Sequence, residues 1–127
     1  MMKRVLSLAF LSFSLLLPAC SGDSPTGGDG VSFSAELQPI FDANCGACHP
    51  PAGGLDLSPA GSYSSLVSVV STGYAPSMRV QPGDPYISVL YGKASGESYS
   101  GAMPPVNLSA LEIETILLWI QEGALDN

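Results

Sequence analysis

Two cysteines and a histidine stand close together in the sequence, as Cys45-Gly46-Ala47-Cys48-His49. Residues three apart on a helical turn face the same way, so both thiols can reach one edge of a flat ring. A histidine directly after the second thiol can then ligate a metal at the centre of that ring. This spacing is the one by which c-type haem is attached through two thioethers. We therefore expect one covalent haem c, with His49 as the proximal iron ligand.

Three other interpretations of a Cys-x-x-Cys pair compete with haem attachment, and each explains the segment less well. A thiol–disulfide oxidoreductase places the pair at the start of a helix in a βαβ unit, and no such pattern surrounds this segment. A zinc site needs four ligands, whereas the chain offers one pair and a single histidine. A disulfide between Cys45 and Cys48 would leave His49 without a role. Haem attachment remains the favoured interpretation.

The second iron ligand must be another residue type, because the chain contains one histidine. Methionine is the usual alternative, and it raises the reduction potential. Met103 is followed by Pro104-Pro105, which would stiffen its loop and lower the entropy cost of holding a thioether over the ring. We expect Met103 as the distal ligand, with Met78 or an open position as the alternatives. The backbone between Pro50 and Gly53 is well placed to accept a hydrogen bond from the other ring nitrogen of His49.

The charge of the chain excludes one class of partner and favours another. After Cys20 the only basic residues are Arg79 and Lys93, whereas all eleven acidic residues lie there, which gives a net charge of −9 (two basic against eleven acidic residues). Nucleic-acid binding depends on clustered Lys and Arg and is excluded. A redox partner with a basic docking patch would be attracted. Arg79 is either a partner for a haem propionate or a solvated surface residue.

The N-terminus has the features of an export signal. A basic start is followed by an apolar run from Val5 to Leu17 that is too short to span a bilayer. The segment Leu17-Pro18-Ala19-Cys20 resembles the bacterial lipoprotein signal, and ordinary signal-peptidase cleavage nearby is the alternative. We expect a cleaved signal at residues 1–19 and a lipid on Cys20. The protein would then be a membrane-anchored lipoprotein outside the cytoplasm, on the periplasmic side or the cell surface.

The remainder divides into a tether at residues 20–31 and one domain at residues 32–127. The tether is rich in Gly, Ser and Asp and cannot bury enough surface to order itself. The domain contains no alternating strand pattern, and its apolar spacing predicts an all-α fold of about four short helices. It is small and has few large apolar side chains, so a covalently held macrocycle would supply the centre that the helices wrap around.

Local signals place the four helices. The first runs from about Ala35 to Asn44 with Ser34 as its cap, and the second begins at Ser62. The third starts at Asp84-Pro85 and ends at Gly92. The fourth opens with a capping box between Ser109 and Glu112 and closes at Gly123. The residues expected to face the core are Leu37, Ile40, Phe41, Tyr63, Leu66, Val67, Val70, Ile113, Ile116, Leu117 and Ile120.

Five short segments, in order, give the chain a likeness to a known family. They are Pro39-Ile40-Phe41 before the CGACH motif, Gly53-Gly54-Leu55 with Leu57, Val80–Pro85 with Ser88 and Leu90, Ala102–Pro105, and Trp119–Ala124. With them the chain resembles a mono-haem class I cytochrome c, and more narrowly the short planctomycete-type cytochrome c domain. The resemblance implies a cytochrome c fold, covalent haem, His49 and Met103 as iron ligands, and electron transfer outside the cytoplasm.

These observations together predict an electron carrier rather than an enzyme. Its iron would cycle between Fe(II) and Fe(III) with no substrate turned over. Two alternatives stay open: a haem enzyme or ligand sensor with an open sixth position, and a thiol–disulfide oxidoreductase. Hydrolytic triads are not supported, because the single histidine is already committed.

Overall fold

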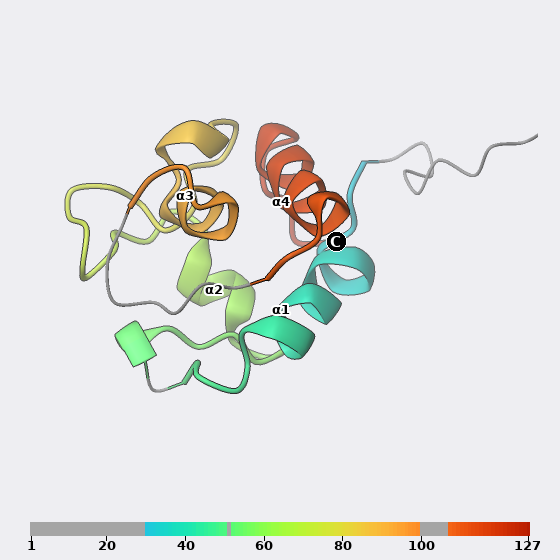
Figure 1. Ribbon diagram of the computed structural model, residues 1–127, viewed down its shortest axis with the longest axis horizontal. Helices are drawn as coiled ribbons and strands as arrows, with labels where there is room; N and C mark the ends of the chain where they lie inside the picture. The colour runs from blue at the N-terminus through green and yellow to red at the C-terminus, as the bar shows by residue number, and fades with distance from the viewer. Residues whose placement is uncertain (1–29, 51, 100–106) are drawn as a thin grey trace, which may run out of the picture.

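The computed structural model describes residues 30–50, 52–99 and 107–127, and the regular structure in this part of the chain is helical. Two isolated β-bridges, between Val67 and Val80 and between Val70 and Met78, are the nearest approach to a strand among these residues. The prediction of an all-α fold is therefore confirmed for them (Figure 1). In chain order the elements are η1 (Phe33–Leu37), α1 (Gln38–Asn44), η2 (Ala52–Gly54), α2 (Ser62–Leu66), η3 (Pro85–Ile87), α3 (Val89–Ser95) and α4 (Ala110–Gln121).

The first helical region begins earlier than the sequence suggested. The hydroxyl of Ser32 accepts from the N–H of Ala35 at 3.3 Å and caps the π-helical turn η1, so the cap is Ser32 and not Ser34. The Ser34 hydroxyl instead donates to the carbonyl oxygen of Asn127 at 2.8 Å. Pro39 lies in the first turn of α1, where the missing N–H costs nothing. The predicted inward residues Leu37, Ile40 and Phe41 are buried.

The second helix is shorter than predicted, and one of its expected core residues is exposed. α2 ends at Leu66, and Val67 already has extended backbone, with ψ 124°. Val70 is 50% exposed, so its predicted burial is wrong. The run of β-branched valines favours extended backbone over helix. The N–H of Arg79 donates to the carbonyl of Val69 at 2.7 Å, and this pairing fixes Arg79 beside α2.

The third helix is also capped by a different glycine from the one predicted. Asp84-Pro85 does start a helical segment, the 3-10 turn η3, which α3 follows after Ser88. α3 then continues through Gly92 and ends at Ser95, where it is capped by Gly96 with the left-handed φ of 73°. A Cβ on the buried Gly92 would collide with the side chains of Ser98 and Tyr99. Gly92 therefore permits a close approach of the segment after α3, and the prediction that it stops the helix is wrong.

The fourth helix matches its prediction closely. The N–H of Glu112 donates to the Ser109 hydroxyl at 3.2 Å, and the Glu112 carboxylate accepts from the N–H of Ser109 at 2.7 Å. This is the predicted capping box. The helix ends at Gln121, and Gly123 follows it with φ of 104°. Ile116 and Ile120 are buried, while Ile113 and Leu117 are half-buried against the core.

An aromatic cluster joins the two ends of the described chain. The Phe33 ring lies 5.3 Å from the Trp119 ring and 5.3 Å from the Tyr63 ring, between centroids. The indole N–H of Trp119 donates to the carbonyl of Leu125 at 2.9 Å, and the Tyr63 hydroxyl donates to that of Ala124 at 2.9 Å. Figure 1 shows η1 and α1 beside α4 and the C-terminal residues. Among the described residues there is no helix with both the length and the apolar character needed to cross a bilayer.

Candidate functional site

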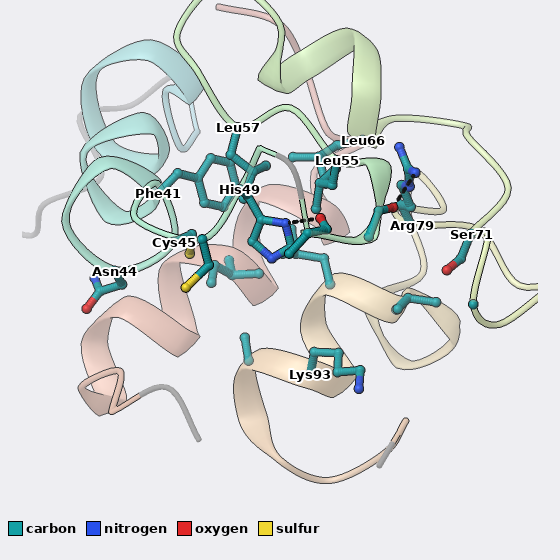
Figure 2. Close-up of a pocket in the computed structure, with 18 of the residues that line it drawn as sticks. Phe41, Asn44, Cys45, His49, Leu55, Leu57, Leu66, Ser71, Arg79 and Lys93 are labelled. Atoms are coloured by element: carbon teal, nitrogen blue, oxygen red, sulfur yellow. Dashed lines mark hydrogen bonds between the residues drawn. The ribbon is translucent and has the colours of Figure 1, made fainter. Parts of the chain in front are cut away.

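A cavity of about 450 Å³ lies between the end of α1, the loop after it, α2, α3 and α4. This volume is within the range of about 300–1,000 Å³ that is usual for small-molecule and cofactor sites. Much of its wall is apolar side chain, including Leu90 and Ile116. Figure 2 shows four more of these side chains, those of Phe41, Leu55, Leu57 and Leu66. The domain thus contains the apolar space that the scarcity of large side chains predicted.

The Cys-x-x-Cys-His segment forms a single turn on the cavity wall. Cys45 caps the C-terminus of α1, and its N–H donates to the carbonyl of Phe41 at 2.8 Å. The N–H groups of Cys48 and His49 both donate to the carbonyl of Cys45 at 3.1 Å. Both thiols and the imidazole line the cavity, and both cysteines are free thiols. The three side chains are therefore brought together as the spacing predicts, with Cys45 half-buried and Cys48 exposed.

One nitrogen of the His49 ring is held by the backbone. Nδ1 lies 2.6 Å from the carbonyl oxygen of Ala52. A carbonyl can only accept, so Nδ1 carries the proton and the lone pair of the neutral ring is on Nε2. Nε2 points toward the space between α3 and α4 (Figure 2). Metal-ligating histidines usually have this second hydrogen bond, and the predicted acceptor within Pro50–Gly53 is confirmed as Ala52.

Arg79 lies on the cavity wall and is bound to backbone carbonyls. Its Nη1 donates to the carbonyl of Ser65 at 2.7 Å. Its Nη2 donates to the carbonyls of Gly54 at 3.1 Å and Gly53 at 3.4 Å. The interpretation of Arg79 as a freely solvated surface residue is therefore wrong: the guanidinium ties the loop after His49 to the end of α2.

Sequence reasoning gave no role to Lys93, which also lines the cavity, from α3. Its ammonium nitrogen lies 4.7 Å from the centroid of the Tyr74 ring. Among the described residues that line the cavity there is no Asp or Glu. Arg79 and Lys93 are the only two basic residues after Cys20, so their scarcity was the signal that could have identified both.

Of the two candidate methionines, the structure describes Met78 but not Met103. Met103 lies outside the described residues, as does Cys20. Described residues on either side of Met103 adjoin the cavity: Leu108 lines it, and the Tyr99 ring packs 5.2 Å from that of Tyr74, which lines it. Met78 is half-buried, pairs its backbone with Val70, and is not among the described lining residues.

The electrostatics of Cys45 favour a neutral thiol. Burial raises the pKa of Cys45, and the nearby Cys48 and Glu112 raise it further. Reactive dithiols have lowered pKa values and sit in electropositive surroundings. Burial of Cys45 therefore favours the protonated thiol over the thiolate that thiol exchange needs. Within residues 30–50, 52–99 and 107–127, no three His, Cys, Asp or Glu side chains gather as a metal site.

Comparison of the chain with protein-family models, with curated proteins and with solved structures found no match. The residues of the site offer two thiols and an imidazole with a free lone pair on one wall, apolar side chains around, and two cations. The lining is therefore chemically divided: thiols and an imidazole are on one part of the wall, apolar side chains surround the space, and two cations complete it.

Proposed function

We propose that the protein is a mono-haem c-type cytochrome that carries single electrons and turns over no substrate. The observation that carries the proposal is that Cys45, Cys48 and His49 share one wall of an apolar cavity whose only described charged residues are cations. Haem has the matching features before it is attached: two vinyl groups toward one edge, iron at the centre and two propionates on the opposite edge. When bound, it supplies the Fe(II)/Fe(III) couple.

The residues of the chain would attach, orient and shield this group. The thiols of Cys45 and Cys48 would each add across one vinyl group, with the sulfur bonded to one carbon and the thiol hydrogen transferred to the other. Ala52 holds the His49 ring through Nδ1 and leaves Nε2 to ligate iron. The apolar wall excludes water and so disfavours the extra positive charge of ferric iron, which raises the reduction potential.

For the second axial ligand we propose Met103. The placement of Leu108 and Tyr99 on the two sides of its segment supports a position near the cavity. Met78 is the weaker candidate, because it does not belong to the described cavity wall. A methionine thioether favours ferrous iron and completes the coordination, which leaves no open site for an exogenous ligand.

A spectroelectrochemical titration of protein made together with a haem-attachment system tests this function. We expect one reversible one-electron step, the weak far-red ferric band of methionine ligation, and a ferrous spectrum that carbon monoxide does not change. Rapid carbon monoxide binding by the parent protein would instead support a haem enzyme or ligand sensor. A dithiol couple without haem absorbance would support the thiol oxidoreductase.

We further propose that the protein is a lipoprotein anchored through Cys20 and that its redox partner is basic. Arg79 and Lys93 both line the cavity, so the charged side chains elsewhere on the described residues are acidic. Cys20→Ser should move the protein from the membrane to the soluble fraction with its haem content unchanged. Equal membrane fractions for variant and parent after an alkaline wash would refute the anchor. Electron transfer to a basic partner should slow as salt is added.

A further inference from the structure

Two cations, Arg79 and Lys93, line the cavity. Their contacts with the rest of the protein differ, and this difference suggests a different role for each. The titratable and charged side chains on the described wall are Cys45, Cys48, His49, Tyr74, Arg79 and Lys93. Glu112 lies behind Cys45, at the thiol end. Figure 2 places Cys45 and Asn44 at one end of the lining and Arg79 at the other. A ligand with acidic groups opposite its thiol-linked edge therefore meets Arg79, Lys93 or both.

Arg79 already makes several hydrogen bonds within the protein. Its two terminal nitrogens donate to three carbonyls, those of Ser65, Gly53 and Gly54. The same loop supplies the Ala52 carbonyl that holds His49, and a Cβ on Gly53 would lie 3.8 Å from Cε1 of the imidazole. Arg79 thus acts on the imidazole through this loop. A planar fork with several donors suits this task, and a single ammonium does not.

The Lys93 ammonium is held more weakly than the Arg79 guanidinium, by a cation–π contact. The interaction that the structure gives its ammonium is with the face of the Tyr74 ring, 4.7 Å from the centroid. Such a contact at an exposed site is weaker than a charge-assisted hydrogen bond to a carboxylate. The ammonium can therefore leave the ring for a carboxylate with a net gain, and it lies on the cavity wall when it does so.

We propose that Lys93 is the main partner of the carboxylates of the bound macrocycle, and that Arg79 is a positioning residue for the His49 loop. This division rests on the proposed function, since it assumes that haem occupies the cavity. A cation beside a propionate stabilises its ionised form and also favours the ferrous over the ferric iron. Both effects come from the charge of Lys93 and not from its shape.

The experiment compares Lys93→Gln with Lys93→Arg in the haem-loaded full chain. Glutamine removes the charge without adding a residue that could ligate iron. We expect Lys93→Gln to keep its covalent haem and visible spectrum, and to have a lower potential. The pH-dependent step in the potential should move upward by about one pH unit or more, because an adjacent opposite charge lowers a carboxyl pKa by about 1–3 units. Lys93→Arg should restore both values.

Arg79→Lys serves as the contrasting variant, because it keeps a positive charge but cannot bind three carbonyls. We expect it to change the hyperfine-shifted haem methyl resonances, which report the orientation of the axial imidazole, and to leave the pH step in place. The division of roles is overturned if Lys93→Gln leaves the potential and its pH step unchanged. Absence of covalent haem in the parent chain would instead refute the proposed function.

Discussion

The two sides of α4 differ in whether protein side chains fill the space next to them. On one side Trp119 packs against Phe33, which in turn packs against Tyr63, and the chain's own aromatic rings fill the space. On the other side Ile116 faces a cavity of about 450 Å³ that the side chains of α3 and the loop after His49 border without filling. We call the first the aromatic core (Phe33, Tyr63 and Trp119) and the second the cavity.

This contrast explains how so short a domain can have both a core and a site. Protein interiors are close-packed, and voids larger than a water molecule are few. An apolar cavity of about 450 Å³ next to a well-packed cluster is consistent with the proposed function, in which a bound haem would complete this side of the domain. The aromatic core should therefore determine stability, and the cavity should determine redox behaviour.

The largest expected effect on stability comes from the aromatic core. Trp119→Ala removes a side chain that is 1% exposed and should lower the free energy of unfolding by about 3–5 kcal/mol. The visible spectrum and the potential should change little, because the indole does not line the cavity. Chemical denaturation of the haem-loaded protein, followed by circular dichroism, measures the loss. A loss below about 1 kcal/mol would contradict the division between core and cavity.

The next largest effect is expected at Gly92, where α3 packs against the segment that follows it. Gly92→Ala should cost about 1–3 kcal/mol, because its Cβ collides with Ser98 and Tyr99 and overpacking forces a backbone shift. Ser95→Ala on the same helix is the matched control, since it loses only an exposed hydrogen bond at 3.3 Å. Thermal unfolding of both variants compares them. Equal melting temperatures for the two would show that Tyr99 is not held in place by Gly92.

The third prediction concerns the cavity side and the distal ligand. Met103→Leu keeps volume and apolarity and should cost less than about 1.5 kcal/mol in stability. The variant should retain its covalent haem. It should lose the far-red ferric band, have a lower reduction potential and bind carbon monoxide, because the thioether ligand is gone. Met78→Leu is the control and should change none of these. If Met78→Leu loses the band and Met103→Leu keeps it, the ligand is Met78.

The smallest effect is at the start of α4. Ser109→Ala removes the hydroxyl that accepts from the N–H of Glu112 and should cost about 1 kcal/mol at neutral pH. Thr115→Ala, whose hydroxyl only donates to the carbonyl of Leu111 within the helix, is the control. Thermal unfolding of the two variants measures the difference. An equal cost for both would mean that the cap contributes nothing.

The same cap gives a pH dependence with a definite sign. The backbone N–H and hydroxyl of Ser109, and then Asn44, hold the pKa of Glu112 below its usual value. Its contribution to stability is therefore present above the ordinary glutamate pKa and is lost as the pH falls through the lower folded value. The difference in melting temperature between the parent and Glu112→Gln should shrink in acid. A difference that grows as the pH falls would contradict this sign.

Local signals in the sequence predicted local structure well and long-range packing less well. The capping box of Ser109 and Glu112 and the turn of Cys45 to His49 depend on residues a few positions apart, and both are found. The exposure of Val70 and the burial of Gly92 depend on pairing with residues 78–80 and 98–99, which periodicity within one segment cannot show.

The site follows the same rule. The Ala52 carbonyl was within reach of a sequence argument, because it lies three residues after His49. Lys93 was not, because its place on the wall depends on how α3 packs against α4, and its contact with Tyr74 joins segments far apart in the chain.

The covalent attachment of haem by Cys45 and Cys48 is tested most directly by intact mass together with a pyridine haemochrome spectrum. The protein would be made with a haem-attachment system and extracted with acid–acetone before both measurements. We expect the mass of one haem on the parent chain, an unextractable haem c spectrum, and the loss of both in the Cys45→Ala/Cys48→Ala double variant. A parent chain with the mass of the polypeptide alone, or haem that acid–acetone removes, would contradict the proposed function.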